Sequence, residues 1–200
     1  MTPRFALTRA LALTAGALMA FISTLAQAAP HRWALSPEQT TLDIALTDHR
    51  AGGDAVSHLR AAPISGMVNA AGDIDIPLSL NQLDIIAQLP PLLTQRALKQ
   101  EEKHIHGHVD PAVLARLAPG QSITSIVTLW DAEHWHIATP VRLIGHNSGL
   151  IGISTPAPVS VDISPLLQQD NASLIMNLLG YQHIDHHIQT SFQGILTPQP

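Results

Sequence analysis

The segment ISGMVNAAGDIDIPLSL, residues 64–80, carries the clearest fold signal in the sequence. Its second part has aliphatic residues at alternate positions, which is the period of a strand with one buried face. These residues are Ile74, Ile76, Leu78 and Leu80. Residues 71–73, Ala-Gly-Asp, separate this row from the apolar residues before it. The segment therefore predicts a β-hairpin.

Alternating segments continue on both sides of the hairpin. They are TTLDIALTD (40–48), QSITSIVTLW (121–130), HWHIATPVRLIG (134–145), SGLIGIS (148–154) and IQTSFQGIL (188–196). Together with the hairpin they predict seven or eight antiparallel strands.

Three segments have a helical pattern instead. They are PPLLTQRALKQEEK (90–103), DPAVLARLAPG (110–120) and NASLIMNLLGY (171–181). Each one is short and interrupts the strands without alternating regularly with them, which argues against a parallel βαβ fold. We expect a mainly β fold, an extended antiparallel barrel or sandwich with short helical excursions.

The first 28 residues resemble a secretory signal peptide. Arg4 and Arg9 precede an apolar run over residues 10–26, and Ala26-Gln27-Ala28 has the small-x-small form of a cleavage site. A membrane anchor is the alternative, but the run contains several polar residues and is marginal in length. We expect a cleaved signal, a single domain over residues 29–200, a periplasmic location and no membrane span in the mature chain.

Charge and composition exclude several classes of function. The signal peptide contains two arginines and no acidic residue, so cleavage would lower the net charge from −5 to −7. Such a chain is a poor partner for nucleic acid. The absence of cysteine excludes disulfides and thiolate ligands.

The sequence contains no convincing catalytic motif. Ser148 in GHNSG (145–149) does not match the G-x-S-x-G motif of serine hydrolases and lies in a predicted turn. Asp73 and Asp75 have the spacing of a solvated strand face. We predict a non-catalytic protein that requires no cofactor, and a hydrolase with unrecognised acids is a remaining alternative.

Twelve histidines raise the question of a metal site. In HIHGHVD (104–110), alternate histidines would share one strand face. His104 and His106, with His134 or His136 from another strand, could supply the nitrogen ligands that zinc takes. The other interpretation is a solvated face, because Ile105 and Val109 would take the core side. A histidine-based periplasmic metal-binding protein is the alternative function.

The abundant aliphatic residues suggest a different use of the barrel. Hydrophobic residues make up 46% of the chain and aromatic residues only 4%, so an interior cavity would suit a flexible hydrocarbon chain. An eight-stranded barrel can hold one small ligand or be filled by its own side chains. The predicted wall residues are Leu42, Ile44, Ile74, Ile76, Ile137, Val141, Leu174 and Leu178.

The order of these segments resembles the YceI-like family of periplasmic polyisoprenoid-binding proteins. The matching segments are WALSPEQTTLDIAL (33–46), the hairpin with its continuation to residue 85, PPLLTQRALKQ (90–100) and the segment from residue 150 to 196. The resemblance covers residues 33–196 and implies a lipocalin-like barrel around an isoprenoid, quinone-like or other amphiphilic lipid. By position, Trp33 matches the opening tryptophan of the family and Arg96 matches a helical arginine at the loop that covers the bore.

One departure from the family pattern concerns the ligand. The usual histidine- and phenylalanine-rich stretch after the arginine is replaced here by EEKHIHGHVD (101–110). The resemblance therefore predicts binding, transport or storage of an amphiphilic lipid, without specifying which one. Whether the protein forms a homodimer is left open.

Overall fold

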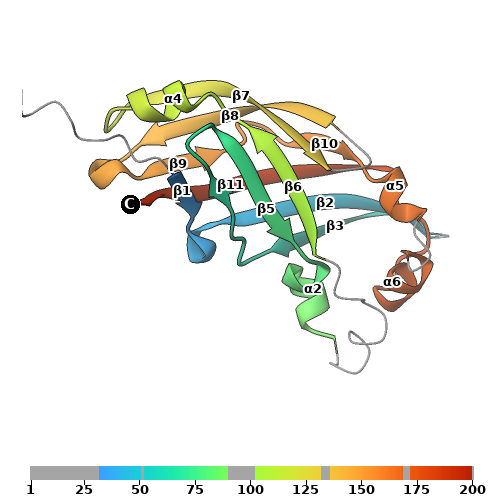
Figure 1. The fold of residues 1–200 in the computed structure, drawn as a ribbon. Helices are drawn as coiled ribbons and strands as arrows, with labels where there is room; N and C mark the ends of the chain where they lie inside the picture. Colours follow the sequence, from blue (N-terminus) through green and yellow to red (C-terminus); the bar gives the residue numbers. More distant parts are fainter. Residues whose placement is uncertain (1–31, 51, 90–101, 132–135, 169–171, 200) are drawn as a thin grey trace, which may run out of the picture.

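The computed structural model describes residues 32–50, 52–89, 102–131, 136–168 and 172–199 (Figure 1). Eleven strands of this part of the chain form one sheet. They are β1 (Arg32–Leu35), β2 (Thr41–Arg50), β3 (Gly53–Ala61), β4 (Met67–Val68), β5 (Asp73–Leu78), β6 (Lys103–His108), β7 (Ser122–Asp131), β8 (His136–Gly145), β9 (Ile151–Ser154), β10 (Val159–Asp162) and β11 (His187–Gln199). The predicted mainly β fold is confirmed.

Eight of these strands form a closed ring of antiparallel pairings. The order is β1, β4, β5, β6, β7, β8, β9 and β11, and β11 pairs again with β1. A sheet that closes on itself in this way is a barrel, with alternate side chains pointing to the interior. The predicted antiparallel, lipocalin-like barrel is confirmed.

The long strand β11 extends the barrel beyond this ring. Its second half pairs with β1 on one side and β9 on the other, whereas its first half pairs with β2 and β10. The segments β1 and β2 thus follow each other along one edge of β11, and β9 and β10 follow each other along the other edge. Beside β2, the hairpin partner β3 completes this extension.

Short helices lie at both ends of the barrel. They are α2 (Asp84–Ala87), α4 (Pro111–Arg116), α5 (Ser164–Leu167) and α6 (Ala172–Leu178), with 3-10 turns at Pro37–Gln39, Leu80–Gln82 and Asn147–Gly149. Figure 1 shows α4 at one end and α2, α5 and α6 at the other. The helices predicted within 110–120 and 171–181 are confirmed. The helix predicted at 90–103 lies almost wholly outside the described residues, and the signal peptide predicted at 1–28 lies wholly outside them.

The interior contains two large groups of buried apolar residues. The first, which we call the barrel core, lies within the closed ring and consists of Trp33, Leu35, Val68, Ile74, Val109, Leu114, Val127, Val141, Leu143, Ile151 and Leu196. The second, which we call the helix-side cluster, consists of Leu46, Leu59, Ile163, Tyr181 and Ile184, with partly buried neighbours on α2, α5 and α6.

The described residues contain eleven strands, whereas the sequence predicted seven or eight, and two local details also differ from the expectation. Strand β3 was not predicted, because its inward positions include the small residues Ala55, Ser57 and Ala61. Leu80, expected in the strand row of β5, begins a 3-10 turn and is exposed. The strand ends because Ser79 accepts a hydrogen bond from the Asn81 amide and donates its own amide to the Gln82 side chain, which is a capping box.

None of the helices in the described ranges has the length and apolar character needed to span a membrane.

Candidate functional site

The strand registers define which side chains point into the barrel. On β8, Thr139, Val141 and Leu143 are buried, whereas the residues between them are exposed. On β2, Leu42 and Ile44 lie opposite Ala61 and Leu59 of β3 and share the inward face with buried Leu46. This alternation is the period-2 pattern of strands with one buried face.

The predicted wall residues fall into two groups. Ile74 and Val141 belong to the barrel core, and Ile76 packs against it. Ile44 packs against the helix-side cluster, whereas Leu42 and Ile137 are partly buried. The structure therefore distributes these residues over both halves of the barrel and does not bring them together at one site.

For three other predicted residues, the structure gives at most the element to which they belong. Leu174 and Leu178 fall within α6. Arg96 lies outside the described residues. The matched tryptophan, Trp33, is buried in the barrel core, and its indole N–H has no hydrogen-bond partner within the described residues.

The helix-side cluster has more partly buried residues than fully buried ones. Its five buried residues contact eight partly buried ones. These eight are Ile44, Leu83, Ile85, Val161, Leu167, Met176, Leu179 and Ile188. They come from the inward faces of β2, β10 and β11 and from the helical end of the molecule, so aliphatic side chains surround a common region. Most of this cluster was missed from the sequence, because its residues lie on short elements that are far apart in the chain.

A histidine and two carboxylates hold one end of this region together. His49 Nδ1 is 2.7 Å from Asp54 Oδ1, and His49 Nε2 is 2.8 Å from Asp185 Oδ1. The hydrogen bonds to Asp185 and Asp54 raise the pKa of His49 to about 9, and the bond from His49 lowers the pKa of Asp185. The histidine is therefore a cation that joins β2 and β3 to the segment before β11 at neutral pH.

The backbone reinforces this connection. Asp48 is fully buried, and its carboxylate accepts hydrogen bonds from the Gln182 and His183 amides at 3.0 and 3.1 Å. The His49 amide also donates to the His183 carbonyl at 2.7 Å. We call residues 48–50, 52–54 and 181–185 the latch. It adjoins the helix-side cluster, since Tyr181 and Ile184 belong to both.

The histidines considered as metal ligands lie on the outer face of the barrel. His104 Nδ1 is 2.9 Å from Asp75 Oδ1, and this contact raises the pKa of His104. The His106 ring lies between those of His104 and Trp130, at centroid distances of 6.1 and 6.4 Å. His136 stacks on the other side of Trp130, and His134 lies outside the described residues. Among the described residues, no three histidines or carboxylates are arranged to hold a metal ion.

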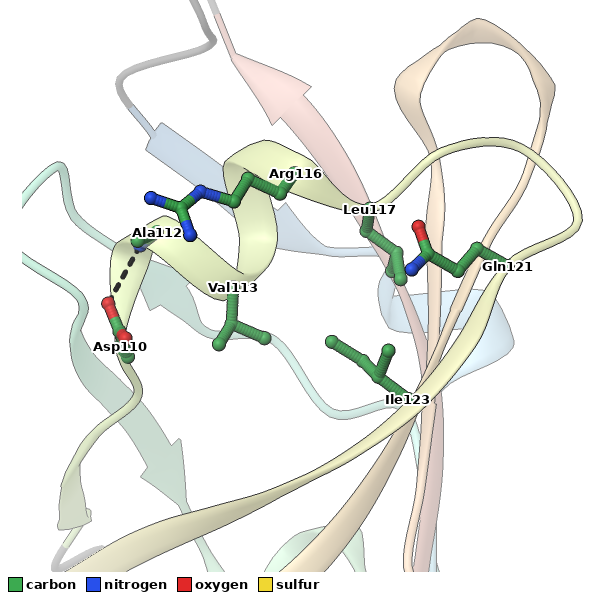
Figure 2. A pocket seen from close by; sticks show the side chains of 7 residues that line it. All are labelled: Asp110, Ala112, Val113, Arg116, Leu117, Gln121 and Ile123. Atoms are coloured by element: carbon green, nitrogen blue, oxygen red, sulfur yellow. Dashed lines mark hydrogen bonds between the residues drawn. The ribbon is translucent and has the colours of Figure 1, made fainter.

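Two surface pockets are lined by described residues. Figure 2 shows the first, about 170 Å³ in volume, where Val113, Leu117 and Ile123 form an apolar floor between α4 and β7. The second, about 450 Å³, is an open depression at residues 183–187. Sites for small molecules usually have volumes of about 300 to 1,000 Å³. The pocket at α4 is thus too small for a long lipid, and the larger one has a mainly polar lining of histidines, Asp185 and Ile184.

Comparison with solved structures supports the fold assignment. The chain is similar to a polyisoprenoid binding domain from Saccharophagus degradans implicated in plant cell wall breakdown, with a TM-score of 0.66 and 16% sequence identity. The match covers 84% of this chain and 98% of that domain. No family model matches the sequence, and no curated protein matches it either. The barrel fold that the YceI-like resemblance implied is therefore confirmed.

Proposed function

We propose that this protein binds a lipid with a long isoprenoid-type tail inside the barrel and transports or stores it in the periplasm without catalysis. The observation that carries the proposal is the helix-side cluster, in which eight partly buried apolar residues surround five buried ones. Burial of apolar surface contributes about 25 cal/mol per Å², so a hydrocarbon tail placed there would gain affinity without a polar network.

The fold neighbour supports the same ligand class. That domain is described as polyisoprenoid binding, and the shared barrel gives both chains an interior of the same general type. An isoprenoid alcohol, its phosphate or a quinone-like lipid would each provide the required tail. The proposal requires no metal or redox cofactor from the protein.

The direct test is to identify what the protein carries. The full-length chain would be expressed in a Gram-negative host, purified from the periplasmic fraction and studied by native mass spectrometry. We expect a mature protein beginning at Ala29 with one co-purifying lipid of prenyl type. A protein that carries no lipid and binds no added prenyl alcohol would contradict the proposal.

A matched pair of variants tests the location of the lipid. Ile44 on β2 faces the helix-side cluster, whereas Val56 on the neighbouring strand β3 points outward and is 63% exposed. An unpaired amide in an apolar site costs about 1 to 3 kcal/mol, so Ile44→Gln should weaken binding of a prenyl alcohol by about tenfold or more. Val56→Gln should leave the Kd unchanged within about twofold. Equal effects of the two substitutions would exclude the inner face of β2 as the binding surface.

A further inference from the structure

Strand β3 has a neighbouring strand on one side only. It stands at the end of the sheet order, and its nine residues pair with β2 from Leu42 to Arg50. In the described ranges no strand pairs with its other edge, where only an isolated bridge joins Ala61 to Leu83. An edge strand presents a row of unpaired N–H and C=O groups, which is a template for pairing with another chain.

The end of this edge next to α2 is already occupied. The Arg60 amide donates to Asp84 Oδ1 at 3.1 Å, and the Ala62 amide donates to the Gln82 carbonyl at 3.0 Å. The Arg60 backbone therefore faces away from β2. Since this direction alternates from one residue to the next in an antiparallel pair, residues 54, 56 and 58 face the same side. Within the part of the chain that the structure describes, their backbone groups have no hydrogen-bond partner on that side.

The side chains at these three positions, which we call the open end of β3, match a second copy of themselves. Asp54, Val56 and His58 are exposed on the outer face, and Val56 is 63% exposed. Asp54 bonds to His49 through Oδ1, yet its side chain remains 65% exposed. A carboxylate and an imidazole thus lie at equal distances on either side of an apolar residue. A half-rotation of such a strand brings each carboxylate opposite an imidazole and the two valines opposite each other.

We propose that two copies of this protein associate through their β3 edges, which pair in antiparallel fashion with Val56 on the two-fold axis. Val56 then pairs with Val56 of the second copy, and Asp54 pairs with His58 of the second copy. These pairs are of the type that exchanges both N–H···O bonds, so the backbone groups of the open end gain partners. The sheets of the two copies become continuous through β3. The inference goes beyond lipid binding and does not depend on it.

The occupied end of the edge selects this register. An axis through Ser57 would pair Asp54 with Arg60 of the second copy, whose amide already donates to Asp84. The axis through Val56 uses only the open end and gives each of its outward side chains a complementary neighbour. Because the contact is confined to a few residue pairs, we expect an interface of the small, transient class, below about 1,200 Å².

Sedimentation velocity of the purified protein gives the first test. We expect a reversible equilibrium, mainly monomer at about 1 µM and with a clear dimer fraction at about 200 µM. Val56→Lys places two like charges at the axis and should weaken dimer formation by about tenfold or more. Ile126→Lys is the matched control, since Ile126 is 61% exposed on β7, a strand paired on both sides, and it should leave the equilibrium unchanged. A wild type that is monomeric at about 200 µM, or equal effects of the two lysines, would overturn the proposal.

Single cysteines test the register, because the chain contains none of its own. In a pair that exchanges both hydrogen bonds the Cα atoms are about 5.5 Å apart, within the range that a disulfide spans. Val56→Cys should therefore form a covalent dimer in an oxidising glutathione buffer about tenfold faster than Ile126→Cys. His58→Cys should be as slow as Ile126→Cys, since its two copies would be four positions apart along the paired strands, about 13 Å.

Non-reducing electrophoresis measures the rates, and thermal unfolding establishes that each variant folds. Equal rates for Val56→Cys and Ile126→Cys would overturn pairing through β3. Crosslinking of His58→Cys as fast as that of Val56→Cys would overturn the register. If Val56→Cys does not fold, the concentration dependence of the wild type decides the proposal.

Discussion

The two halves of this barrel bury the same types of side chain to different extents. In the barrel core, eleven buried apolar residues have seven partly buried neighbours, and the ring of paired strands closes around them. In the helix-side cluster, partly buried residues outnumber buried ones, and short helices take the place of continuous strands. Continuous strand pairing thus coincides with a larger share of fully buried side chains, which favours stability. Interrupted pairing coincides with a larger share of partly buried side chains.

The largest expected difference between the halves is the free energy of unfolding lost when a leucine is replaced by alanine. Leu143→Ala removes a side chain that is 1% exposed in the barrel core and should destabilise the fold by about 3 kcal/mol. Leu179→Ala, in a partly buried position beside the helix-side cluster, should cost about 1 kcal/mol, since its surroundings are already accessible. Urea unfolding would measure both values. Equal losses would mean that the two halves are packed alike.

A smaller effect is expected at Gly194 of β11, where the backbone lies against the side chain of Thr40, the residue before β2. Gly194→Ala would place a Cβ 2.7 Å from Thr40 Oγ1, and overpacking of this kind costs about 1 to 3 kcal/mol. Gly52→Ala is the control, because no atom lies within 4 Å of its built Cβ.

A double-mutant cycle shows whether this cost arises from Thr40 itself. Thr40→Ala combined with Gly194→Ala should recover much of the loss, which would give a coupling energy of about 1 kcal/mol between the two sites. Additive losses would show that the two residues do not compete for the same space.

The sequence predicted the barrel better than it predicted which residues lie in the barrel core and which lie in the helix-side cluster. Strand period, turns and the hairpin at 64–80 are local signals, and they predicted antiparallel strands in a barrel or sandwich. The choice of a lipocalin-like barrel came from the YceI-like resemblance. The inward row of β3 escaped prediction because Ala55, Ser57 and Ala61 carry little hydrophobic signal. Their inward position depends on pairing with β2, which is a nonlocal property.

The candidate site depends even more on nonlocal contacts. Ile44 and Ile74 have the same pattern in the sequence, yet one contacts the helix-side cluster and the other lies in the barrel core. His49 and Asp185 meet across 136 positions of the chain. No periodicity or spacing argument could have paired them, and the histidines of HIHGHVD drew attention to the outer face instead.

The latch offers a pH-dependent test of how β2 and β3 are held to the segment before β11. Hydrogen bonds from the His49 ring to Asp185 and Asp54 raise the pKa of His49 from 6.5 to about 9. Its contribution to stability is therefore fully present below pH 6.5 and is lost as the pH rises through about 9. The hydrogen bond from His49 lowers the pKa of Asp185. The stability that this carboxylate contributes is therefore lost only when the pH falls below the ordinary pKa range of aspartate.

The measurement compares thermal unfolding of the wild type with that of His49→Gln. The wild type should have the higher Tm at pH 6, and the difference should shrink between pH 8 and pH 10. His58→Gln, an exposed histidine on β3, should show no comparable change with pH. A constant difference across this range would mean that the charge of His49 does not stabilise the latch.

The smallest effects are expected on the outer face, where the histidines of β6 lie away from both halves of the interior. His104 already contacts Asp75 and Glu102, at 2.9 and 3.3 Å, and a metal would have to displace these contacts. Three protein ligands are the usual minimum for zinc, and the described residues do not converge in such a set. His104→Ala combined with His106→Ala should therefore change neither prenyl alcohol binding nor Tm by a measurable amount. Elemental analysis after mild chelation should find less than one zinc per chain in the wild type, and stoichiometric zinc that disappears in the double variant would instead identify the outer face as a metal site.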